Sequence, residues 1–136
     1  MAVNIVKKVY ECFGKGDING FLELCEENIE WVVNGPYLLE KCQSFTGHKG
    51  VRRFLKILEG TWSFNTFVPR EFIVDNNKVV VLGEETGTNR LTGEEFQNRW
   101  AHVFTIRSNK IVSFREFLCN WCGDQHPPAM SWQESI

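Results

Sequence analysis

The chain has 136 residues, 43% of them hydrophobic, and its 15 basic and 17 acidic side chains give a formal charge of -2. This length predicts one domain with a core large enough to fold without a metal or a disulfide. The charge lacks the positive excess typical of nucleic-acid-binding proteins, so we expect no nucleic-acid partner. Five Trp and eleven Phe indicate either a ring-rich core or a pocket lined by rings.

The first half of the sequence predicts helices. Apolar residues recur at helical spacing from Val3 to Phe13, and Gly14-Lys15-Gly16 ends this helix. Asp17 is a suitable N-cap for a second helix. Further along, the pattern predicts a short strand at 29–33, an irregular stretch at 37–46 and a third helix from 47 to 60.

The second half predicts strands separated by turns. The strands are expected at 63–74, 78–88, 94–107 and 111–121, and the turns between them are rich in Asn, Asp and Gly. Helices followed by an antiparallel meander are typical of the α+β class. We take residues 1–122 as one domain and 123–136, which contain Pro127-Pro128, as a C-terminal tail.

The expected location of the protein is cytoplasmic. The start of the chain lacks the basic and apolar segments of a signal peptide, and no apolar run approaches the ~20 residues of a membrane span. The five cysteines, at positions 12, 25, 42, 119 and 122, are an odd number without the dense spacing of a disulfide framework. We therefore expect reduced thiols and no membrane partner.

Short patterns in a fixed order carry a family resemblance. They are Gly14 to Asp17, the strand around Trp31, Gly47 to Val51, Asn98 to Phe104, Lys110 to Val112, and Arg115-Glu116-Phe117. In this order they resemble the nuclear-transport-factor-2-like superfamily, in its SnoaL-like and ketosteroid-isomerase-like branch. The resemblance implies a cone-shaped α+β fold, in which three N-terminal helices pack on a curved, mainly antiparallel sheet and enclose an apolar pocket.

Alternation along 94–107 separates two faces of one strand. An apolar wall with a few polar groups is typical of a ligand site. Asn98 and His102 are the polar members of this face, and they either hydrogen-bond within a packed core or contact a ligand. The resemblance places His102 where ketosteroid isomerases have a carboxylic acid that donates to the substrate oxyanion. The whole face consists of Phe96, Asn98, Trp100, His102, Phe104 and Ile106.

The resemblance also shows changed positions. The isomerase base falls on Val33, which cannot take a proton, and the tyrosine of helix one falls on Val9. Tyr10 is one residue away, about 100° around the helix. Many SnoaL-like proteins carry an Asp where this chain has Cys119. Steroid isomerisation by the isomerase mechanism is therefore not expected.

Acidic residues of the predicted sheet are further candidates. Matching the last strand to its isomerase counterpart places Glu116 and Leu118 inward, where burial would raise the pKa of the carboxyl group and suit acid–base catalysis. The alternative is an outward Glu116 paired with an arginine of the sheet. One of Glu84 and Glu85 must face inward, but alternation does not say which.

Two functions are compatible with these residues. The first is a cofactor-independent SnoaL-like enzyme of isomerase, cyclase or dehydratase type, acting on an apolar polyketide-, terpenoid- or steroid-like substrate, with His102 and Glu116 as catalytic residues. The second is a non-catalytic module that binds a hydrophobic ligand or assembles as a dimer. The expected ligand contacts are Tyr10, Trp31, Val33, Asn98, Trp100, Phe104 and Leu118.

Neither function is expected to need a cofactor or a metal. Cys119 and Cys122 form a C-x-x-C followed by His126, but a fourth zinc ligand at suitable spacing is absent from the sequence. The resemblance implies a homodimer through the outer sheet face. That face carries Arg99, Val103, Arg107 and Phe117 among others.

Overall fold

The structure is a computed structural model that describes residues 2–120. In chain order the elements are α1 (Ala2–Lys15), α2 (Ile18–Glu23), β1 (Cys25–Asn34), β2 (Ser44–Thr46), α3 (Gly47–Thr61), β3 (Trp62–Asp75), β4 (Lys78–Asn89), β5 (Glu95–Arg107) and β6 (Lys110–Asn120). Within this part of the chain, no helix is both long and apolar enough to cross a membrane. The proposed tail at 123–136, Cys122 and His126 lie outside the described residues.

The helices form where the sequence predicts them. Asp17 caps α2, because its side chain accepts a hydrogen bond of 2.9 Å from the backbone N–H of Gly20. The buried residues of α1 are Ile5, Val6 and Val9, and those of α3 are Val51, Phe54, Leu55 and Leu58. This spacing gives each helix one apolar stripe to pack on the sheet.

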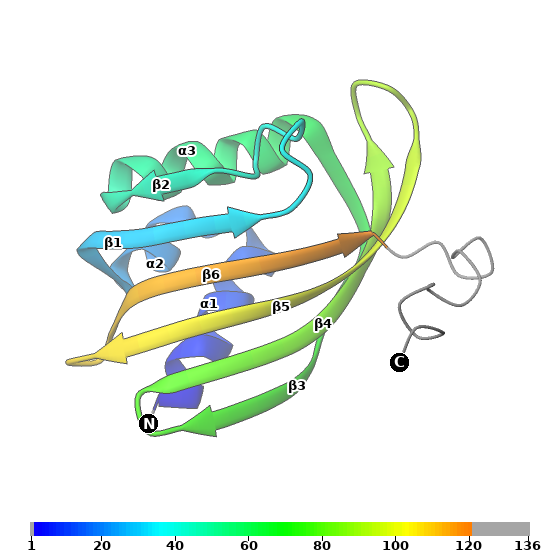
Figure 1. Ribbon diagram of the computed structural model, residues 1–136. Helices are drawn as coiled ribbons and strands as arrows, with labels where there is room; N and C mark the ends of the chain where they lie inside the picture. The colour runs from blue at the N-terminus through cyan, green and yellow to red at the C-terminus, as the bar shows by residue number, and fades with distance from the viewer. Residues whose placement is uncertain (1, 121–136) are drawn as a thin grey trace, which may run out of the picture.

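One sheet of six strands has the order β2-β1-β6-β5-β4-β3. The strands β3 to β6 form an antiparallel meander, and β1 runs parallel to β6 in the middle of the sheet. Figure 1 shows the sheet curving around the helices, which lie on its concave side. The α+β class and the mainly antiparallel curved sheet are thereby confirmed.

Register shifts contribute to the curvature. The pairing of β3 with β4 shifts between Phe64 and Thr66 and again between Pro69 and Glu71. An extra residue on one strand of a pair bends that strand and increases its twist. Pro69 is tolerated here because β3 is an edge strand and its proline needs no outer hydrogen bond.

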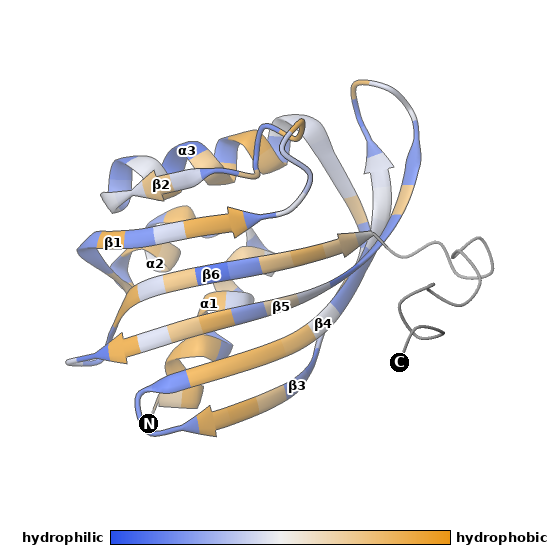
Figure 2. Cartoon of the chain, viewed as in Figure 1, coloured by the Kyte–Doolittle hydropathy of each residue, from blue (hydrophilic) through white to orange (hydrophobic). Residues whose placement is uncertain are grey.

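The predicted alternation of β5 is confirmed. Asn98, Trp100, His102, Phe104 and Ile106 are buried, whereas their neighbours along the strand are half-buried or exposed. Figure 2 shows apolar and polar positions along β5, and a longer apolar stretch in the first half of β4. The stretch 37–46, predicted irregular throughout, contains the short strand β2, in which Phe45 is buried and pairs with Trp31.

Candidate functional site

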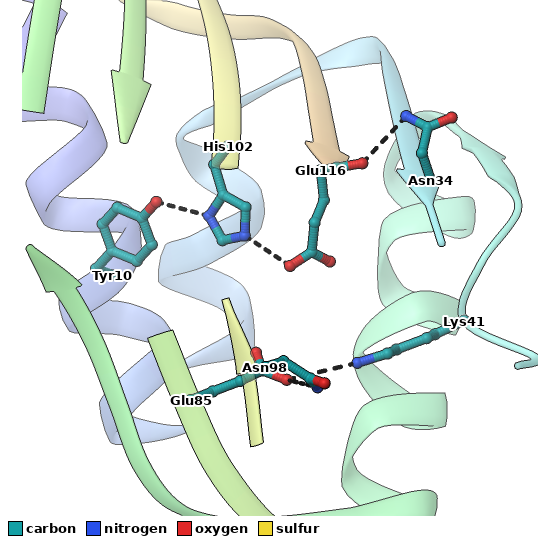
Figure 3. Close-up of polar contacts among 7 residues, drawn as sticks. All are labelled: Tyr10, Asn34, Lys41, Glu85, Asn98, His102 and Glu116. Atoms are coloured by element: carbon teal, nitrogen blue, oxygen red, sulfur yellow. Dashed lines mark hydrogen bonds and ion pairs between the residues drawn. The ribbon is translucent and has the colours of Figure 1, made fainter. Parts of the chain in front are cut away.

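His102 lies in the concave face of the sheet between two hydrogen-bonding partners. It is directly opposite Glu116 in the register of β5 and β6, and its Nε2 lies 2.9 Å from Glu116 Oε2. Its Nδ1 lies 2.7 Å from the hydroxyl oxygen of Tyr10, which comes from α1. Figure 3 shows the three side chains in line, so that the imidazole connects a phenol to a carboxylate.

The protonation states of Glu116 and Tyr10 follow from the burial and charge around each side chain. Burial would raise the pKa of Glu116, but the neighbouring His102 outweighs burial and lowers it, so the carboxyl group is ionised. The sequence led us to expect a raised pKa for Glu116, and this expectation is wrong because His102 faces it. Burial, together with the charge of Glu116, raises the pKa of Tyr10, which keeps its proton.

These states define the direction of each hydrogen bond. The ionised Glu116 can only accept, so Nε2–H of His102 donates to it. In the neutral ring Nδ1 then accepts from the hydroxyl of Tyr10. If the ring gains a second proton, Nδ1–H donates to the Tyr10 oxygen and the hydroxyl hydrogen is free to donate elsewhere. The three residues therefore stay hydrogen-bonded in both states of the ring.

Aromatic rings fix the orientation of the imidazole. Trp100 stacks on His102 with the ring centroids 3.8 Å apart and the planes at 6°. The Tyr10 ring lies nearly parallel to the imidazole at 5.9 Å, and Phe114 packs on it at 4.9 Å. Rings held from several sides have little rotational freedom, so the imidazole is ordered before any ligand binds.

A second polar group lies on the same concave side. Glu85 is 1% exposed and accepts a hydrogen bond of 2.9 Å from the amide nitrogen of Asn98. The ammonium nitrogen of Lys41 lies 3.8 Å from the same Glu85 oxygen. Burial raises the pKa of Glu85, although Lys41 and Asn98 partly oppose this effect. Glu84 faces outward and pairs with Arg70, so the structure decides which of the two glutamates is inward.

The two polar groups line one apolar cavity between the helices and the sheet. Its volume is about 40 Å³, on a measure by which one water molecule needs about 10–15 Å³. A second cavity of about 150 Å³ lies next to it, towards the ends of the helices. The cavities share the lining residues Phe13, Phe21, Leu55, Leu58 and Phe64, which therefore separate them.

The sequence-predicted residues divide into two groups. Tyr10, Trp31, His102, Phe104 and Glu116 line the cavity of about 40 Å³. The other expected ligand contacts are at least half-buried but lie outside this lining: Val33, Asn98, Trp100 and Leu118. Asn98 is turned to Glu85, and Trp100 is covered by the rings of His102, Tyr10 and Phe67.

The structure places Tyr10 where a ligand contact was expected, but it also brings in a residue that the sequence did not indicate. Tyr10 is offset by one residue from the family's tyrosine position at Val9, and both Val9 and Tyr10 line the cavity. A shift of about 100° still leaves a side chain as long as tyrosine within reach of the sheet. Lys41 was missed, because it lies in a loop without periodicity, where no pattern indicates a direction for the side chain.

The described residues do not form a metal centre. Among residues 2–120, no three His, Cys, Asp or Glu side chains are grouped in a way that could hold a metal ion. Cys119 is exposed at the end of β6, and the other cysteine of the C-x-x-C lies outside this range.

Comparisons with known proteins agree with the observed fold. The model of the SnoaL-like domain family matches residues 6–114. An NTF2-like protein from Burkholderia xenovorans is similar, with a TM-score of 0.80 and 29% identity over 87% of this chain and 88% of that one. TerC, co-crystallised with polyporic acid, has a TM-score of 0.77 and 25% identity over 87% and 91%.

A more distant structure shows the fold alone. A putative SnoaL-like polyketide cyclase from Mesorhizobium loti has a TM-score of 0.69 and 18% identity over 86% of this chain and 98% of that one. Among curated proteins, no match to this chain is found.

Proposed function

The chain belongs to the SnoaL-like family, and we propose that it is an enzyme of isomerase, cyclase or dehydratase type that moves protons on an apolar substrate without a cofactor. The observation that carries the proposal is the hydrogen-bonded chain of Tyr10, His102 and Glu116 in the wall of an apolar cavity. A phenol, an imidazole and a carboxylate in this order are suited to general acid–base catalysis.

The proposed step begins with a neutral His102. A carbon acid next to a substrate carbonyl gives its proton to the oxygen of Tyr10 while the hydroxyl hydrogen moves to Nδ1. The C–H bond breaks, an O–H bond forms on Tyr10, and the imidazolium charge lies 2.9 Å from the Glu116 carboxylate. The reverse movement at another carbon of the enolate completes an isomerisation. Tyr10 touches the substrate, since both nitrogens of His102 are engaged.

The substrate class follows from the lining. Most cavity residues are aromatic or aliphatic, which favours a flat apolar ring system such as a polyketide, a terpenoid or a steroid-like compound. TerC, which was co-crystallised with polyporic acid, supports ligand binding by this fold. A ring system needs more space than about 40 Å³, so we propose that side chains shared by the two cavities, such as Phe13 and Phe64, move when the ligand binds and join the cavities.

Deuterium exchange into a probe ketone tests the proposal. We expect the protein to accelerate exchange of the acidic C–H protons of 2-tetralone in deuterated buffer, as followed by proton NMR. His102→Gln and Glu116→Gln should each lower the protein-catalysed rate by about 100-fold or more. Glu30→Gln, on the exposed side of β1, is the matched control and should leave the rate unchanged.

The same experiment can contradict the proposal. Binding of 2-tetralone is measured separately by saturation-transfer NMR. A protein that binds the ketone but exchanges its protons no faster than buffer is not acting as a proton-transfer catalyst. Full exchange by the folded His102→Gln variant would remove His102 from the mechanism.

The alternative function is a non-catalytic ligand-binding or assembly module. The small volume of the cavity favours it, because side chains already fill most of the space that a substrate would occupy. This alternative predicts binding without exchange in the experiment with 2-tetralone.

We also propose that a second copy of the chain covers the convex face of the sheet. Leu82, Ala101 and Phe117 are opposite one another in the register of β4, β5 and β6, and Phe117 is 46% exposed. An apolar row on an exposed sheet face is suited to a two-fold contact. Sedimentation should show a dimer at micromolar concentration and a monomer for Phe117→Glu; a monomeric wild type would contradict this assembly.

A further inference from the structure

Lys41 is buried in a loop that exposes two of its apolar residues. The loop between β1 and β2 leaves Tyr37 87% and Leu38 82% exposed, whereas Lys41 is 3% exposed. Backbone hydrogen bonds from Cys42 N–H to the Leu39 carbonyl and from Gln43 N–H to the Lys41 carbonyl hold the turn that directs this side chain inward. Lysine is almost never fully buried without a partner, so a loop that buries its lysine and exposes Tyr37 and Leu38 requires an explanation.

The partners of Lys41 leave its ammonium group incompletely satisfied. Its nitrogen lies 3.8 Å from Glu85 Oε2, which is beyond hydrogen-bond length, and 4.7 Å from the centre of the Trp62 ring. Within residues 2–120 the ion pair with Glu85 is the one contact with an oxygen that the structure gives this nitrogen, although an ammonium group has three hydrogens to donate. The indole N–H of Trp62, which lies under the ammonium group, is buried without an acceptor in this part of the chain.

The carboxylate that faces Lys41 is held by another residue. The same oxygen of Glu85 accepts the hydrogen bond of Asn98, which fixes the carboxylate against β5. Figure 3 shows Lys41 approaching Glu85 and Asn98 from the opposite side, below the pair of His102 and Glu116. Lys41, Glu85, His102 and Glu116 all line one cavity. The unfilled donors of Lys41 are therefore next to the space that a ligand would enter.

We propose that Lys41 binds an anionic oxygen of the ligand, and that the ligand is an apolar ring compound with one acidic oxygen, such as a carboxylate or an enolate. The inference rests on the proposed function insofar as it places a ligand in this cavity. Few water molecules fit between the groups, so the attraction of the ammonium for an anion is weakly screened. An oxygen at this point would also accept hydrogen bonds that Glu85 does not accept.

A structural ion pair is the competing explanation. A buried pair at 3.8 Å without a hydrogen bond recovers little of the cost of removing two charges from water. A cationic side chain that binds a ligand can lack a hydrogen-bonded partner in the free protein, since the ligand then supplies the missing acceptor. The raised pKa of Glu85 fits this second case, because a protonated Glu85 leaves the positive charge of Lys41 uncompensated.

The test compares two probes that match in shape and differ in charge. Binding of 2-naphthoate and of neutral 2-naphthalenemethanol is measured by quenching of tryptophan fluorescence. We expect the wild type to bind the carboxylate at least about 10-fold more tightly than the alcohol. Lys41→Met should abolish this preference, so that the variant binds the carboxylate no more tightly than the alcohol. Lys56→Met, on the exposed side of α3, is the matched control and should keep the preference.

The possible results distinguish a failure of the Lys41 proposal from a failure of the proposed function. Equal affinity of the wild type for both probes would overturn the role of Lys41 and leave the ligand cavity intact. Binding of neither probe would contradict the ligand cavity itself. If the folded Lys41→Met variant still prefers 2-naphthoate to the alcohol, another cationic side chain binds the carboxylate and the proposal for Lys41 is wrong. If Lys41→Met does not fold, the double variant Lys41→Met/Glu85→Gln removes both charges, and it should likewise lack the preference.

Discussion

Gly83 is the point at which the sheet accommodates the ring that covers His102. A Cβ atom at this position would lie 2.5 Å from Cζ2 of Trp100 and 2.6 Å from the backbone oxygen of Val68. Carbon atoms normally approach no closer than about 3.5 Å, so one methyl group would require movements of about 1 Å. The Trp100 ring is held at 3.8 Å from the imidazole of His102, and the Val68 oxygen belongs to the neighbouring strand.

Gly83→Ala should therefore destabilise the protein and disturb the site together. Overpacking of this kind costs about 1–3 kcal/mol, and we expect the upper half of this range because one of the contacts is with backbone. Equilibrium unfolding in urea, followed by circular dichroism, measures the loss. Exchange of 2-tetralone protons should also slow, since Trp100 positions His102.

Gly14→Ala is the matched control. Gly14 lies in α1, and among the described residues a Cβ atom added to it would meet nothing within 4 Å beyond its own helix backbone. Alanine favours helix more than glycine, so this variant should be about 0.5 kcal/mol more stable than the wild type. A Gly83→Ala protein within about 0.5 kcal/mol of the wild type would refute the packing argument.

The other expected outcomes concern single ionisable groups. The raised pKa of Glu85 means that its contribution to stability is present below the usual carboxyl pKa and is lost as the pH rises through its folded value. Glu85→Gln should remove this decline in the free energy of unfolding as the pH rises above the usual carboxyl range. Parallel profiles of urea unfolding against pH for the two proteins would contradict this. Tyr10→Phe should reduce 2-tetralone exchange by about 100-fold, at a stability cost of about 1 kcal/mol; an unchanged rate would exclude the phenol from the proton path. Burial raises the pKa of Cys25 to about 12, so iodoacetamide at about pH 8 should label exposed Cys119 but not Cys25 in the folded protein. Equal labelling by peptide mass spectrometry would refute this protection.

Local patterns predicted most of the fold. The N-cap at Asp17 and the alternation from Asn98 to Ile106 depend on neighbours in sequence, and both were predicted correctly. The pairing of β1 with β6 depends on residues far apart along the chain, so no local pattern indicates it. The strand β2 is too short to show alternation, and its buried Phe45 is positioned by pairing with β1.

The site was harder to predict because long-range contacts decide it. Alternation gave the inward direction of His102, but the register of β5 with β6 brings Glu116 opposite its ring. The choice between Glu84 and Glu85 depended on the register of β4 with β5, in which Glu85 faces Asn98. The inward direction of Lys41 is set by hydrogen bonds within its loop, and these have no signature in the sequence.

The cavity wall contains more polar groups than a packed apolar core needs. A core gains stability from aromatic rings alone, and replacing buried ion pairs by apolar residues is often neutral or stabilising. This cavity nevertheless contains a phenol, an imidazole, two carboxyl groups and an ammonium group among its rings. The environments of the two carboxyl groups move their pKa values in opposite directions, down for Glu116 and up for Glu85. Such a division is typical of sites that pair a charged group with a group able to carry a proton near neutral pH. We therefore propose that these polar residues act on a ligand, and the exchange of 2-tetralone protons decides between the enzyme and the binding module.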